Sequence, residues 1–127
     1  MRIQLTSLLL LLLAFACSTE QAQFDEDAPV VDVRQPKAGQ QFRSDVLMPV
    51  EVVLTENLGL HTYFIWLVET ESGAPHLVDK AHLHARSHTV DTSYATSELP
   101  AGNYELVVTA TDHDQNTTEV RVPLAIE

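Results

Sequence analysis

Residues 99–127 read LPAGNYELVVTATDHDQNTTEVRVPLAIE, and this stretch decides the fold class. Apolar and polar residues alternate over 104–111 and again over 119–126, which predicts two β-strands that each bury one face. The residues between them, 112–116, are turn formers. We expect the apolar face that begins at Tyr104 and the one that ends at Ile126 to meet across a sandwich.

Strand patterns extend over the rest of 29–127. Short runs typical of strands cover 30–34, 46–55, 60–69 and 77–90, with turn residues between them and no helical period. The run 60–69 is apolar at nearly every position, which predicts a central strand covered on both faces, with Tyr63, Phe64 and Trp66 in the core. The pattern predicts an all-β, antiparallel sandwich of about seven strands.

Two groups of residues carry a resemblance to known families. The corner Pro100-x-Gly102-x-Tyr104 and the turn Asp112–Asn116 resemble the C-terminal half of bacterial immunoglobulin-like domains, although Gln115 stands where the usual turn has Gly. The stretch 56–65, ENLGLHTYFI, and the pair His82-x-His84 are similar to an uncharacterised family of Gram-negative, His-rich immunoglobulin-like lipoproteins. The resemblance implies an immunoglobulin-like domain over 29–127 and names no activity.

The N-terminus has the features of an export signal. Arg2 precedes an apolar run that includes leucine at every position from 8 to 13 and is too short to span a bilayer. The only cysteine, Cys17, follows directly, and the residues 14–17 (AFAC) resemble the lipobox of bacterial lipoproteins. We therefore expect a lipoprotein signal peptide over 1–16, then a lipidated Cys17 and a flexible acidic tether over 17–28. The alternative is an ordinary secretory signal followed by an unrelated cysteine.

The lipobox resemblance also implies a location. Lipoprotein anchors carry two or three acyl chains, which hold a protein on a membrane far more firmly than a single chain does. Ser18 stands where some lipoproteins carry the Asp that retains them in the inner membrane. We expect the chain to be lipid-anchored at the outer membrane, on its periplasmic or surface side.

Charge and missing motifs narrow the function. Lys and Arg number 7 against 18 Asp and Glu, a net charge of −11, which argues against nucleic acid and against adsorption to anionic lipid. The sequence has no Gly-x-Ser-x-Gly, no phosphate-binding loop and no His-Glu-x-x-His. We expect a non-catalytic binding module. The alternative is a structural or adhesion subunit of an envelope protein complex that uses no metal.

The six histidines suggest a ligand for such a module. If 82–88 is one strand, His82, His84, Arg86 and His88 point the same way, because side chains alternate along a strand. Neutral imidazoles at this spacing can share Zn²⁺ or Cu²⁺. Further ligands are then expected from the remaining histidines: His61, His76 and, on the turn, His113. The alternative is a solvated polar face of a sheet.

A calcium loop is a weaker candidate. Asp112, Asp114 and Asn116 place oxygen ligands at the first, third and fifth positions of such a loop. Thr117 and Pro123 stand where the loop requires Gly and Glu. An Asx-type turn between two strands explains the same residues and is the favoured interpretation.

Overall fold

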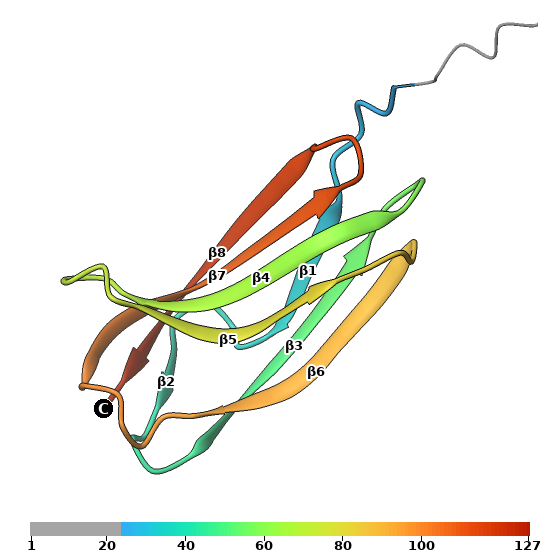
Figure 1. The fold of residues 1–127 in the computed structure, drawn as a ribbon. Helices are drawn as coiled ribbons and strands as arrows, with labels where there is room; N and C mark the ends of the chain where they lie inside the picture. Colours follow the sequence, from blue (N-terminus) through green and yellow to red (C-terminus); the bar gives the residue numbers. More distant parts are fainter. Residues whose placement is uncertain (1–23) are drawn as a thin grey trace, which may run out of the picture.

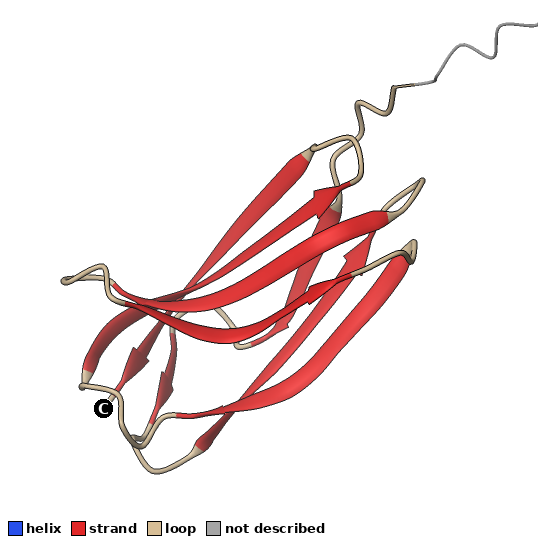
Figure 2. Ribbon diagram, viewed as in Figure 1, coloured by secondary structure: helices blue, strands red, loops and turns tan. Residues whose placement is uncertain are grey.

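The computed structural model describes residues 24–127, and these residues form strands, turns and loops without a helix (Figure 2). The expected signal peptide, Cys17 and most of the expected tether lie outside the described residues. The strands are β1 (Val30–Gln35), β2 (Gln40–Phe42), β3 (Leu47–Thr55), β4 (Leu60–Glu69), β5 (Pro75–His82), β6 (Ser87–Ala95), β7 (Gly102–Asp112) and β8 (Thr117–Ile126). Within 24–127 no helix is available to cross a bilayer.

The strands form two sheets that face each other (Figure 1). One sheet has three strands in the order β1-β3-β6, and the other has five in the order β2-β8-β7-β4-β5. All pairings are antiparallel except the short parallel pairing of β2 with β8. The expected all-β sandwich is confirmed. The structure has eight strands because a three-residue strand, β2, follows the turn after β1 and because the run 77–90 is divided between β5 and β6.

The core lies between the sheets and is aliphatic. On β3, every second residue from Met48 to Leu54 is fully buried, as the period of a strand with one core face requires. The five-stranded sheet covers these residues with its own alternating positions. Its buried core residues are Phe42, Leu60, Tyr63, Ile65, Leu67, Tyr104, Leu106, Val108, Ala110, Val122, Leu124 and Ile126.

The last two strands confirm the predicted alternation but not the predicted partner. β7 and β8 are antiparallel neighbours in one sheet, with Leu106 opposite Val122 and Tyr104 opposite Leu124. Their apolar faces therefore lie side by side and meet the three-stranded sheet, rather than each other, across the core. Alternation identifies the buried face of a strand, but it does not specify which strand lies opposite.

The expectation that β4 is covered on both faces was wrong. Tyr63, Ile65 and Leu67 are buried as predicted, but Phe64 is 37% exposed and Trp66 is only partly buried. The two aromatic rings lie parallel on the outer face of the sheet, with centroids 6.5 Å apart. Antiparallel sheets commonly leave one face in water, and β4 follows that rule although its sequence is apolar at most positions.

The run 77–90 is not one strand. β5 ends at His82 and β6 begins at Ser87, and residues 83–86 carry the chain from one sheet to the other. The straight row of His82, His84, Arg86 and His88 therefore does not exist, because strand alternation stops after His82.

Candidate metal centre

Four histidines from four different segments lie together at one end of the sandwich. His61 stands at the start of β4, His82 ends β5, and His84 lies in the 83–86 crossover. His113 stands in the turn between β7 and β8. We call these four residues the histidine cluster.

Each ring of the histidine cluster contacts two others. The centroid of His61 lies 4.3 Å from that of His82 and 4.6 Å from that of His113. His84 closes the circuit, at 4.8 Å from His82 and 5.4 Å from His113. Three rings are solvent-exposed and His61 is half-buried, so an ion could approach from water.

Backbone irregularities create this arrangement. A β-bulge between Leu60 and Thr62 interrupts the pairing of β4 with β7, and a bulge can redirect a side chain. The crossover is fixed to β4 by two backbone hydrogen bonds, in which Leu83 N–H donates to the carbonyl of His61 (2.7 Å) and Leu60 N–H donates to that of Ala85 (2.9 Å). His84 is thereby held beside His61.

The surroundings of His61 favour its neutral imidazole, the form that binds a metal. The pKa of His61 is lowered, first by its burial and then by the neighbouring His82, His113 and His84. Its Nδ1 atom is buried and has no hydrogen-bond partner in the described part of the chain. A buried ring nitrogen without a partner is costly unless something else binds it.

The four rings are neighbours, but no three of their nitrogen atoms, each from a different ring, lie within 4.8 Å of one another. In the described part of the chain, the one group of three potential ligand atoms within 4.8 Å of one another is Asp25, Glu56 and Asp112. A metal at about 2.0–2.1 Å from each nitrogen therefore requires rotations of the imidazole rings. Such rotations are open to the three exposed side chains.

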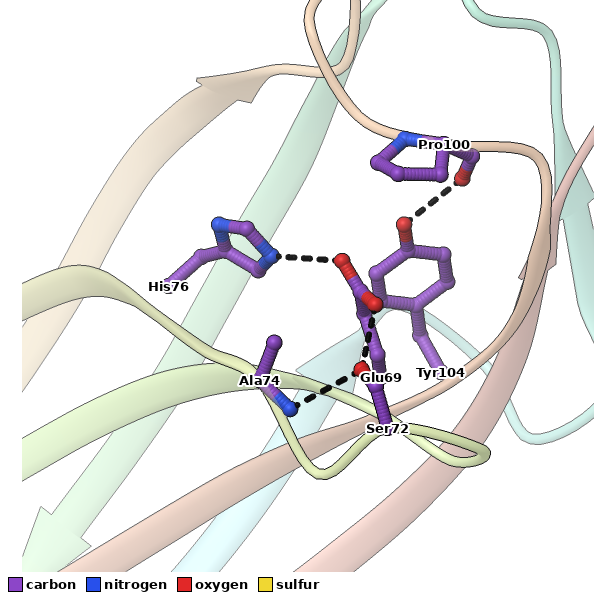
Figure 3. A network of polar contacts seen from close by, with 6 residues as sticks. All are labelled: Glu69, Ser72, Ala74, His76, Pro100 and Tyr104. Carbon is purple, nitrogen blue, oxygen red and sulfur yellow. Dashed lines mark hydrogen bonds and ion pairs between the residues drawn. The ribbon is translucent and has the colours of Figure 1, made fainter.

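The other two histidines lie in different surroundings. His76, near the start of β5, contacts Glu69 with 3.1 Å between Nε2 and Oε1 (Figure 3). Ser72 and His76, in that order, lower the pKa of Glu69. His88 is on β6, in the opposite sheet, and stacks on Tyr63 with centroids 5.5 Å apart. Neither ring is part of the histidine cluster.

The sequence anticipated the members of the cluster but not the reason they meet. His61 and His113 were candidates only as supplements to a row on one strand, whereas their rings lie directly against those of His82 and His84. The carboxylates of Asp25 and Glu56 were not anticipated as a site at all. No local spacing signals them, because they stand 31 positions apart on either side of three strands.

The chain was compared with known families, curated proteins and solved structures. No known protein family and no curated protein matches the chain. Among solved structures, the chain is similar to the fibronectin(III)-like modules of CbhA from Clostridium thermocellum, with 16% identity and a TM-score of 0.43 over 76% of this chain and 94% of the module.

Proposed function

We propose that this chain is a non-catalytic binding module, lipid-anchored at the outer membrane, that binds Zn²⁺ or Cu²⁺ through His61, His82, His84 and His113. The observation that carries the metal part is the closed circuit of four imidazole rings with centroids 4.3–5.4 Å apart. Imidazole nitrogen is a preferred ligand for both ions.

A metal titration tests the histidine cluster. The full chain, purified in detergent and treated with EDTA, is titrated with Zn²⁺ and with Cu²⁺ in a calorimeter at pH 7.5. We expect one site with a dissociation constant below about 10 μM. The double variant His82→Ala/His84→Ala and the single variant His113→Ala should each weaken binding at least about tenfold, which corresponds to about 1.4 kcal/mol.

The chain supplies its own controls. His76→Ala and His88→Ala remove an imidazole outside the cluster, so both should bind the metal as the unaltered protein does. Equal losses in the cluster variants and in these controls would indicate nonspecific binding, and the metal proposal would then be abandoned.

The membrane anchor is a separate part of the proposal. It rests on Cys17, at the end of the leucine-rich N-terminal run. In cells labelled with a radioactive fatty acid, we expect the protein to carry the label and to fractionate with the outer membrane. Cys17→Ser should abolish the label and release the protein; an equally labelled Cys17→Ser variant would contradict lipidation at this residue.

One observation favours the second candidate, a structural subunit of an envelope complex. Phe64 and Leu77 are 37% and 39% exposed on β4 and the edge strand β5, beside the partly buried Trp66. Exposed apolar surface next to a free sheet edge suits a protein contact. Crosslinking in intact cells should then yield an adduct that Phe64→Ser removes and that EDTA leaves unchanged.

A further inference from the structure

Three carboxylates meet where the N-terminal segment joins the sandwich. Asp25 precedes β1, Glu56 follows β3, and Asp112 ends β7. Each contributes an oxygen to a group whose atoms all lie within 4.8 Å of one another. We call these three residues the acidic triad.

Burial makes the acidic triad unusual. Glu56 is 8% exposed, Asp112 is 2% exposed, and Asp25 is half-buried. Like charges at such distances repel one another, and water screens the repulsion poorly once the groups are buried. None of the ion pairs formed within 24–127 joins a Lys, Arg or His to any of the three.

Two oxygens of the triad have no hydrogen-bond donor among residues 24–127. Glu56 Oε2 accepts the backbone N–H groups of Leu58 (2.6 Å) and Gly59 (2.5 Å), but Glu56 Oε1 is buried without a partner. Asp25 Oδ2 is likewise buried and unpartnered. Buried carboxylate oxygens are normally satisfied by a donor or a metal ion, so these two oxygens are placed to bind a cation.

The backbone and the amide side chains hold the triad in place. Asn116 donates through its backbone N–H to Asp112 Oδ1 and through Nδ2 to Asp112 Oδ2, both at 2.8 Å. The same Nδ2 donates to the carbonyl of Asp25 (2.8 Å), and Asn57 Nδ2 donates to Asp25 Oδ1 (3.2 Å). Asp112 thus accepts a hydrogen bond from the backbone four residues on, rather than the two of the expected Asx turn, and the turn holds Asp112 in position.

The donor set selects the ion. All ligand atoms of the triad are oxygens and carry negative charge, which suits a hard cation and disfavours the nitrogen- and sulfur-seeking metals. Ca²⁺ accepts six to eight oxygens in flexible geometry, whereas Mg²⁺ demands a near-ideal octahedron. Two further carboxylates lie nearby. Asp27 Oδ2 accepts a hydrogen bond from Asn57 Nδ2, and Asp114 Oδ2 accepts one from the backbone N–H of Asp25.

We propose that Asp25, Glu56 and Asp112 form a Ca²⁺ site that fastens the end of the tether to the domain. Glu56 directly follows β3 of the three-stranded sheet, Asp112 ends β7 of the five-stranded sheet, and Asp25 belongs to the segment that leads toward Cys17. An ion held by all three fixes the direction in which the chain leaves the domain.

The site is tested on the full chain, purified in detergent and treated with EGTA. Titration with Ca²⁺ should show one site with a dissociation constant of about 10⁻⁴ M, the range of extracellular calcium modules. The melting temperature should rise with Ca²⁺ concentration, and amide hydrogen exchange at residues 25–28 should slow. Mg²⁺ should bind at least tenfold more weakly.

Isosteric variants assign the ligands. Asp25→Asn and Glu56→Gln should each weaken Ca²⁺ binding at least tenfold, whereas Glu71→Gln, on the hairpin at the far end of β4, should leave it unchanged. Asp25→Asn lies before the first strand, so it remains informative if Glu56→Gln does not fold. Absence of Ca²⁺ binding, or equal affinity in Asp25→Asn, overturns the proposal. His82→Ala/His84→Ala should retain the Ca²⁺ site, which separates this outcome from that of the histidine cluster.

Discussion

At the scale of single residues, Tyr104 and Gln115 show how local chemistry supports the hairpin of β7 and β8. The Tyr104 hydroxyl donates a hydrogen bond of 2.6 Å to the carbonyl of Pro100, four residues upstream (Figure 3). This is the tyrosine corner of immunoglobulin-like sandwiches. Burial, followed by the charge of Glu69, raises the pKa of Tyr104, so the hydroxyl stays protonated and able to donate.

Tyr104→Phe should cost about 1–2 kcal/mol of unfolding free energy, because the ring still fills its site while the carbonyl of Pro100 loses its donor. Urea unfolding at pH 7.5 measures the difference. Tyr94→Phe serves as the control, since the Tyr94 hydroxyl makes no hydrogen bond to any residue of 24–127. A loss in Tyr104→Phe no larger than in this control would contradict the corner's contribution.

Gln115 occupies the glycine position of the turn, with φ of 68°. The left-handed conformation costs an L-residue roughly 1–2 kcal/mol, whereas Gly adopts it freely but loses more backbone entropy on folding. Gln115→Gly should therefore stabilise the protein by about 0.5–1 kcal/mol. Gln115→Ala retains the Cβ atom and should give no such gain in the same urea experiment.

At the scale of secondary-structure elements, β4 shows that burial follows the position of a side chain on the sheet rather than its apolarity. Ile65 faces the core and is fully buried, whereas its neighbour Phe64 lies on the outer face. Both are large apolar residues in the middle of one strand. The register with β7, where Ile65 pairs with Val108 and Phe64 pairs with Thr109, fixes which of them points inward.

Ile65→Ala should therefore destabilise the protein by about 2–5 kcal/mol, as in other fully buried sites, and Phe64→Ala by about 1 kcal/mol or less. Thermal and urea unfolding of the two variants give the comparison. Similar losses in both would show that the outer face of β4 is covered in solution.

At the scale of the whole molecule, the polar sites are divided between the two ends of the sandwich. The histidine cluster lies at the beginning of β4, and the Glu69–His76 pair lies at its end. Ten residues of strand separate the two ends by about 30 Å. The acidic triad shares the end of the histidine cluster, because Asp112 directly precedes His113.

The protonation of His61, at this end of the sandwich, makes the stability of the folded protein depend on pH. Its pKa is lowered in the folded state, so the unfolded chain binds a proton more readily as the pH falls. The stability of the folded state should thus be complete above about pH 6.5 and should decrease as the pH falls toward the lowered pKa. The carboxylates Asp25 and Glu69, whose pKa values are also lowered, begin to contribute only nearer their ordinary values of 3.8 and 4.5.

The corresponding measurement is urea unfolding in EDTA and EGTA at pH 7.5 and pH 5.5. The unaltered protein should be less stable at pH 5.5, and His61→Asn should reduce the difference between the two values. His76→Ala is the control outside the cluster. An unchanged pH difference in His61→Asn would mean that other groups account for the loss.

The sequence predicted features that depend on neighbouring residues better than features that depend on contacts between distant residues. Alternation is local, so it located β7 and β8 within a few residues of their bounds and identified their core faces. The apolar run located β4 but did not reveal that one of its faces is exposed. The crossover at 83–86 was missed because its residues are compatible with a continuing strand. The hydrogen bonds that hold the crossover in place are made with β4, more than twenty positions away in the sequence. His82 and His84 were therefore grouped correctly, but on the basis of a strand that does not exist.

The sequence by itself determined an all-β sandwich, since the period of its apolar residues fixes how each strand is oriented with respect to the core. Only the tertiary structure decided which strands are neighbours and which distant side chains meet. It brought His61 and His113 to the His82–His84 pair, and Asp25 to Glu56 and Asp112. Such contacts depend on strand order, bulges and turns, which are set by the packing of the whole chain and leave no local period to read.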